Sequence, residues 1–151
     1  MTRIAVISDS HNQIRPEVEA LLRSADAVIH AGDIACDETY DALKRINGRT
    51  TFVRGNMDRD LKVRQLPSTQ ALSLGGFEFY VLHDLGQLDL DPSGRFNFVV
   101  YGHSHRANEE QKDGVTFLNP GSIGPQRFNN LPSFASIELS DGEAKVTFHT
   151  L

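Results

Sequence analysis

Residues 3–11 read RIAVISDSH, and this stretch decides the fold. Its first six residues are mostly apolar and β-branched and lead into a polar loop, which predicts a buried β-strand. Asp9 and His11 follow that strand at once. In open α/β sheets, ligands bind beyond the carboxyl ends of the strands, so these two side chains are candidate ligands from the outset.

The chain after this stretch alternates between helix and strand patterns up to residue 54. A helix is predicted from Pro16, and a second helix carries an apolar stripe over residues 40–46 that Asn47-Gly48 ends. Short apolar strands are predicted at residues 27–30 and 50–54. This βαβαβ order predicts parallel strands with right-handed crossovers.

The second half of the chain has the character of an all-β segment. Gly75-Gly76 joins two predicted strands at residues 70–74 and 77–83, and Asp141-Gly142 is a strong signal for a second hairpin. Further strands are predicted at 98–101, 115–118, 134–139 and 144–149, and no amphipathic helix is expected after residue 95. The predicted fold is an α/β, two-sheet β-sandwich flanked by helices, formed by residues 1–151 as a single domain.

Length and composition exclude several classes of protein. The chain has 151 residues, no apolar run near the ~20 that cross a bilayer, and an N-terminal apolar stretch too short for a signal peptide. The single cysteine, Cys36, makes no internal disulfide, and we therefore expect a cytoplasmic protein. The net charge of −5 argues against binding long nucleic acids but leaves a small phosphorylated substrate open.

Oxygen and imidazole donors follow five successive predicted strands. These seven donors, which include four of the six histidines, are Asp9, His11, Asp33, Asn56, His83, His103 and His105. Seven donors are too many for one ion but suit two ions that share a carboxylate. Nitrogen and oxygen donors suit Mn, Fe, Zn, Ni or Co rather than a thiolate-bound ion, and of these Mn is the expected metal. Two such ions about 3.5–4 Å apart would clamp the attacking and leaving oxygens of a phosphoryl transfer.

The ordered set D-x-H, G-D, G-N, H and G-H-x-H resembles the calcineurin-like metallophosphoesterases. Within that family, the chain resembles the small YfcE-like phosphodiesterases, which are related to the retromer subunit of vacuolar sorting. Residues 119–122 (NPGS) match a further signature of this small subtype. The resemblance implies a metallophosphoesterase-like αββα four-layer fold. It also implies a metal-dependent phosphodiesterase in which a metal-bridging hydroxide is the nucleophile.

The resemblance also implies a role for each donor. The first ion would be held by Asp9, His11, Asp33 and His105, and the second by Asp33, Asn56, His83 and His103. Asp33 would then bridge the two ions, and the catalytic residues would be Asp33, Asn56 and His103. Two positions depart from the family pattern: Met57 stands where larger relatives have a histidine, and Asp84 replaces a common glycine. A thioether is no general acid, and Asp84 could tune a metal, bind a substrate cation or face water.

Other polar residues have plainer interpretations. His30 and His149 are expected to be structural, Cys36 to be a small apolar side chain, and Asp58 to fix the Asn56 loop or Arg59. Asn119 could hold a metal ligand in place by a hydrogen bond without touching the metal itself. Surface solvation is the preferred interpretation of the three arginines Arg54, Arg59 and Arg127, with phosphate binding as the alternative.

Three alternatives to the phosphodiesterase stay open. The first is a phosphomonoesterase or nucleotidase, and the second is a non-catalytic protein-binding scaffold that keeps a metal site. A nuclease is the weakest, because the chain lacks a basic stripe interleaved with aromatic residues. The expected partner is a small phosphoester; a membrane and nucleic acid are not expected, and a homo-oligomer is left open.

Overall fold

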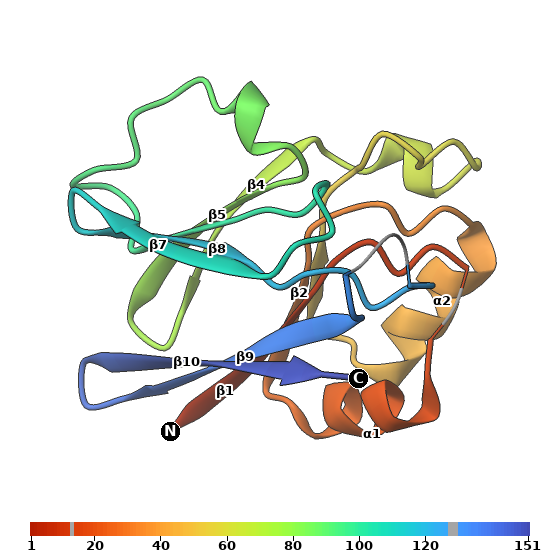
Figure 1. Cartoon of the computed structure of the whole chain (residues 1–151), viewed down its shortest axis with the longest axis horizontal. Helices are drawn as coiled ribbons and strands as arrows, with labels where there is room; N and C mark the ends of the chain where they lie inside the picture. Colours follow the sequence, from red (N-terminus) through yellow and green to blue (C-terminus); the bar gives the residue numbers. More distant parts are fainter. Residues whose placement is uncertain (13, 127–129) are drawn as a thin grey trace.

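The computed structural model describes residues 1–12, 14–126 and 130–151. Two five-stranded sheets pack face to face, and two α-helices lie along one side of the sandwich (Figure 1). The mixed α/β fold with two sheets is therefore confirmed. In this described part of the chain, no helix has the length and apolar character needed to span a membrane.

The first sheet has the strand order β10-β9-β1-β2-β3. Its strands are β1 (Thr2–Ile7), β2 (Ala27–His30), β3 (Thr50–Phe52), β9 (Ser133–Ser140) and β10 (Glu143–Thr150). The first three strands run parallel, with Ile4 opposite Ala27 and Val28 opposite Thr50. Helices α1 (Pro16–Ser24) and α2 (Asp37–Ile46) connect them, so the predicted βαβαβ unit is confirmed.

The second sheet has the strand order β4-β5-β6-β8-β7. Its strands are β4 (Thr69–Leu74), β5 (Phe77–Leu82), β6 (Phe98–Val100), β7 (Asn108–Lys112) and β8 (Val115–Asn119). Both predicted hairpins form, β4–β5 here and β9–β10 in the first sheet. Strand β7 escaped prediction because all five of its side chains are exposed, so it carries no apolar alternation.

Three apolar layers hold these elements together. Phe79 and Phe98 stack between the two sheets with their ring centroids 4.9 Å apart. The buried Leu22 and Leu43 of the two helices pack on the outer face of the first sheet. The outer face of the second sheet is covered by the segment 84–97, which includes the 3₁₀ turn η2 (Leu85–Gln87) and places Phe96 against Tyr80. A second 3₁₀ turn, η1 (Val63–Gln65), precedes β4.

The loops after the parallel strands of both sheets meet at one end of the sandwich. The Asp9 amide donates to Gly32 O, which ties the loop after β1 to the loop after β2. The Gly102 amide donates to His83 O, which joins the loops after β6 and β5. A hydrogen bond from the His103 amide to the Asp9 carboxylate connects the two sheets. The fold therefore brings together the strand ends that carry the predicted donors.

Candidate metal centre

All seven predicted donors lie at this end of the sandwich. Two groups of their ligand atoms each lie within 4.8 Å of one another. One group is Asp9, His11 and His105, and the other is Asp9, Asp33 and His83. Asp9 is common to both groups, whereas the family pattern gives the shared position to Asp33.

Asp9 is the buried carboxylate on which both groups converge. Its Oδ1 lies 3.4 Å from His105 Nε2 and 3.8 Å from His83 Nε2. Its Oδ2 accepts hydrogen bonds from the Ser8 hydroxyl at 2.6 Å and from the His103 amide at 3.2 Å. One carboxylate oxygen is therefore fixed by the protein, and the other faces imidazoles.

Asp33 and His83 are oriented in the same way by atoms behind them. Asp33 Oδ1 accepts the Met57 amide at 2.8 Å, and Asp33 Oδ2 lies 3.4 Å from His83 Nε2. His83 Nδ1 donates to Ala31 O at 2.8 Å, which aims Nε2 into the site. Such outer contacts set the tautomer and ring direction of metal-binding histidines in other proteins.

Asn56 and His103 complete the set at the solvent side of the second group. Asn56 Oδ1 lies 2.9 Å from His83 Nε2 and 3.2 Å from His103 Nδ1. The rings of His83 and His103 meet edge to face, with centroids 5.2 Å apart. Both Asn56 and His103 are exposed, so a bound molecule can reach them from outside.

The donor set fits divalent transition-metal ions. Asp9 Oδ1 is buried and has no hydrogen-bond partner, an arrangement that is costly for a carboxylate oxygen and that a cation relieves. The surrounding atoms are imidazole nitrogens, carboxylate oxygens and an amide oxygen, which are the donors that Mn, Fe, Zn, Co and Ni share. Binding of one or two ions by these seven residues stays a prediction.

The backbone at the site is unusual. Eight non-glycine residues among those described have a positive φ between 52° and 75°. Five of the eight are predicted donors, namely Asp9, His11, Asp33, His103 and His105. Left-handed backbone is unfavourable for residues with a Cβ, and it concentrates at functional sites, where it aims side chains that a regular strand or helix would point elsewhere.

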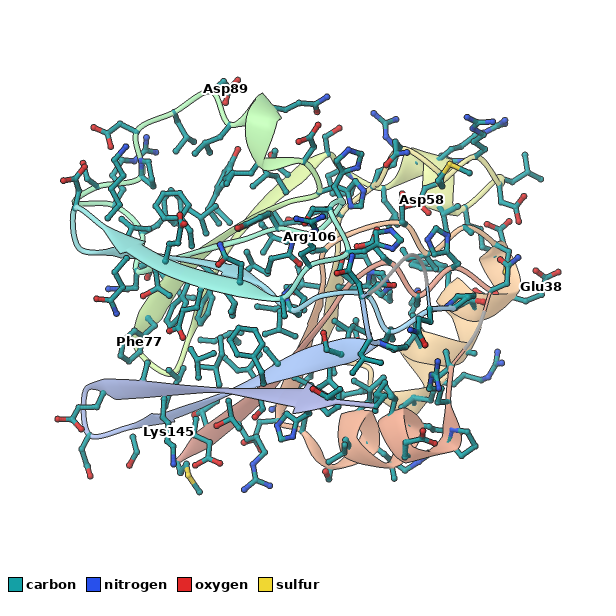
Figure 2. The ribbon with its side chains drawn as sticks, viewed as in Figure 1. Glu38, Asp58, Phe77, Asp89, Arg106 and Lys145 are labelled. Atoms are coloured by element: carbon teal, nitrogen blue, oxygen red, sulfur yellow. The ribbon has the colours of Figure 1, made fainter. Side chains whose placement is uncertain are left out.

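Asp58 holds two of the ligand loops together, and its full role could not be foreseen. It is 4% exposed, at the loop end of the sandwich (Figure 2). Oδ1 accepts the amides of Ile34 and Ala35 at 2.7 Å, and Oδ2 accepts those of Asp33 at 3.1 Å and Gly55 at 2.7 Å. The sequence predicted support of the Asn56 loop, but nothing in it signalled the equal support of the Asp33 loop.

Gly55 is required by close approach between those two loops. A Cβ at Gly55 would overlap the backbone nitrogen and the carboxylate of Asp33. Asn119 supports a third loop, because its side-chain amide donates to Gly102 O at 3.1 Å and to Ser104 Oγ at 3.0 Å. The sequence predicted such a supporting role for Asn119.

The remaining candidates take structural or surface positions. His30 is fully buried and its Nε2 lies 2.8 Å from Ser10 Oγ, while His149 stacks on Phe134, so both are packed as predicted. Cys36 precedes α2 with its Sγ 3.1 Å from Thr39 Oγ1. Arg54 and Arg59 are exposed, and Arg127 lies outside the described residues.

The charges of the site shift the pKa values of Asp33 and His83 in opposite directions. Burial alone would lower the pKa of His83, but its contact with Asp33 and the negative charges of Asp9 and Asp33 raise it to about 9. Burial alone would raise the pKa of Asp33, but His83 and the Met57 amide lower it to about 2. Without metal, the pair is therefore a protonated imidazole beside a carboxylate at neutral pH.

This pair predicts how the stability of the chelator-treated protein depends on pH. Because the pKa of His83 is higher in the folded protein than its ordinary value of 6.5, its contribution is complete below about pH 6.5 and is lost as the pH rises through about 9. We expect the free energy of unfolding in urea to fall by a few kcal/mol across that interval, since each pKa unit corresponds to about 1.4 kcal/mol.

The control for this prediction is His149, which stacks on Phe134 and is not one of the predicted donors. His149→Gln should keep the fall in stability, and His83→Gln should flatten it. An equal fall in the His83→Gln protein would show that another group is responsible.

Known proteins resemble the chain in sequence and in structure. The model of the calcineurin-like phosphoesterase superfamily domain matches residues 2–142. A probable metallophosphoesterase of Mycoplasma pneumoniae is 30% identical over 160 residues, covering 99% of this chain and 98% of the relative. A phosphodiesterase of Methanocaldococcus jannaschii is 25% identical over 137 residues, covering 79% of this chain and 82% of the relative.

Vacuolar protein sorting 29 from Cryptosporidium parvum has the same fold, with a TM-score of 0.76 at 20% identity over 99% of this chain and 97% of that one.

Proposed function

Because the chain belongs to the calcineurin-like phosphoesterase superfamily, we propose that it is a phosphodiesterase that uses two divalent metal ions. The observation that carries this proposal is that five of the seven donors form two groups that share Asp9, with one buried oxygen of that carboxylate left without a hydrogen bond. The other two donors, Asn56 and His103, lie beside His83. The relative named as a phosphodiesterase supports the choice of a diester. The proposal includes the cytoplasmic location expected from the sequence.

The proposed reaction is hydrolysis of one P–O bond. An oxygen from water bonds to phosphorus, the bond to one alcohol breaks, and that alcohol leaves with a proton while a phosphomonoester remains. When bound, the ions would neutralise the phosphate oxygens and lower the pKa of water so that hydroxide is available near neutral pH. We assign the first ion to Asp9, His11, Asp33 and His105, and the second to Asp33, Asn56, His83 and His103.

The chain's own residues add two constraints to this reaction. Asn56 and His103 are the exposed members of the set, so they are placed to touch the substrate phosphate. Met57 is 41% exposed at the position where a proton donor would stand in larger relatives, and its thioether donates no proton. The proposal therefore favours esters whose alcohol leaves without assistance.

The test is metal-dependent hydrolysis by chelator-treated protein. We expect Mn²⁺ to restore hydrolysis of bis(p-nitrophenyl) phosphate, and the rate on this diester to exceed that on p-nitrophenyl phosphate. A higher rate on the monoester would favour the phosphomonoesterase. No hydrolysis of either ester with Mn²⁺, Fe²⁺, Zn²⁺, Co²⁺ or Ni²⁺, by protein that is folded, would contradict the proposal.

A non-catalytic scaffold is the second candidate. The fold likeness to vacuolar protein sorting 29 favours it. The complete donor set favours the enzyme, because a protein-binding scaffold has no need of seven converging donors.

A further inference from the structure

A cavity of about 380 Å³ opens beside the candidate metal centre. Three predicted donors, Asn56, His83 and His103, form part of its wall. The other described residues that line it are Arg54, Gly55, Ser68, Thr69, Leu82, Asp84, Gln87 and Asp89. The cavity therefore borders the place where the proposed function puts the substrate phosphate.

Two carboxylates in this wall have no cationic partner among the described residues. Asp84 is half-buried, and its Oδ1 accepts the Gly86 amide at 3.0 Å, which fixes the carboxylate beside His83. Asp89 follows η2 on the segment outside the second sheet (Figure 2). The ion pairs within 4.0 Å involve neither of them.

Arg54 stands in the same wall but does not neutralise these carboxylates. Its guanidinium donates to Arg64 O and to Ser68 Oγ, both at 3.2 Å, which holds it at the β4 side of the cavity. The cavity wall thus contains Arg54, held by two hydrogen bonds, and two carboxylates that form no ion pair within 4.0 Å. A ligand with an anion and a separate cation matches this distribution of charge.

We propose that this cavity binds the alcohol moiety of the phosphodiester, and that Asp84 and Asp89 select an alcohol that carries an ammonium group. The proposal rests on the proposed function, and it names the substrate class as phosphodiesters of amino alcohols. Nucleosides fit less well, because His83 and His103 are the only rings in the described lining and both belong to the donor set. Leu82 is its one large apolar side chain, so an apolar alcohol gains little there.

A larger cavity of about 470 Å³ does not compete for this role. It lies on the outer face of the second sheet, between residues such as Leu88 and Val115, and borders none of the seven donors. Volume alone therefore does not locate the substrate.

The test compares two esters that differ in one atom. p-Nitrophenyl phosphorylcholine carries a quaternary ammonium, and p-nitrophenyl 3,3-dimethylbutyl phosphate has carbon in place of that nitrogen. We expect kcat/KM of the Mn²⁺-loaded protein to be about tenfold higher for the choline ester, which is the effect of one partly shielded charge contact. Asp84→Asn, which keeps an oxygen for the Gly86 amide, should bring this ratio close to one, and Asp89→Asn should lower it.

The control variant is Asp91→Asn. Asp91 lies on the same segment but outside this cavity, so the ratio should not change. Hydrolysis of both esters at equal rates, or a ratio that survives Asp84→Asn and Asp89→Asn, would overturn the inference and leave the proposed phosphodiesterase standing.

A binding measurement separates the inference from the proposed function. If neither ester is hydrolysed, calorimetric binding of phosphocholine and of 3,3-dimethylbutyl phosphate to the same protein decides the matter. Tighter binding of phosphocholine that is lost in Asp84→Asn would support selection of the ammonium group by this cavity, although the enzyme proposal would fail. Equal binding of the two phosphates would overturn the proposed selection of an ammonium group as well.

Discussion

Replacing Asp33 with asparagine is expected to lower metal-dependent kcat/KM for bis(p-nitrophenyl) phosphate by roughly 10³-fold. The charge stabilisation that a bound metal supplies is worth several kcal/mol, and each 1.4 kcal/mol is about tenfold in rate. Asparagine keeps an oxygen for the Met57 amide but replaces the oxygen that faces His83 with an NH₂ group. The fold should therefore survive while one of two central carboxylates is lost.

Two measurements check this result. Steady-state kinetics over a range of Mn²⁺ concentrations gives the loss of activity, and calorimetric titration gives the number of ions bound. Asp26→Asn is the matched control, because Asp26 is exposed and, within the described part of the chain, its side chain accepts one hydrogen bond, from the Arg3 amide. Activity of Asp33→Asn within tenfold of the unchanged protein would contradict the proposed role of Asp33.

Replacing Asp58 with alanine is expected to cost about 4 kcal/mol of unfolding free energy or more. Four backbone amides lose their acceptor, and each buried donor left without one costs roughly 1–3 kcal/mol. Two of these amides belong to Asp33, a predicted donor, and to Gly55, which directly precedes the predicted donor Asn56. We therefore also expect metal affinity to fall about 10–100-fold, as it does when outer supports of metal ligands are removed.

Denaturation in urea and titration with Mn²⁺ measure the two effects of Asp58→Ala. The comparison variant is Asp60→Ala, two residues along, where an exposed carboxylate accepts one amide, that of Asp37. Its cost should stay near 1 kcal/mol, a typical value for one hydrogen bond. Asp58→Asn tests the same contacts, because the NH₂ group of asparagine replaces one carboxylate oxygen. That group cannot accept the two backbone amides that donate to this oxygen. If Asp58→Ala and Asp60→Ala cost the same, the loops are held by other contacts.

The strand ends could be predicted because a strong local pattern marks them. In β1 and β2, short apolar runs lead within three residues to a polar donor, and parallel strands bring their carboxyl ends to one edge. The hairpins were equally clear, since Gly75-Gly76 and Asp141-Gly142 supply the positive φ that tight turns need. Strand β7 carries no such pattern, because an exposed edge strand buries neither face.

The details of the site were beyond the sequence for a different reason. The four amides that donate to Asp58 come from two loops about twenty residues apart. Hydrogen bonds between loops so distant in the sequence leave no local pattern. The position of Asp9 in both ligand groups likewise depends on how the two sheets pack. The cavity lined by Arg54 and Asp84 forms only when β4 and β5 lie beside the loop after β3.

The left-handed backbone at the five donors has an evolutionary consequence. Glycine adopts this conformation freely, whereas other residues pay about 1–2 kcal/mol for it. Replacement of Asp9 or His103 by glycine would relieve that strain as it removed a predicted donor. A lineage with no use for metal would therefore drift toward glycine at these positions, and only selection for the chemistry opposes that drift.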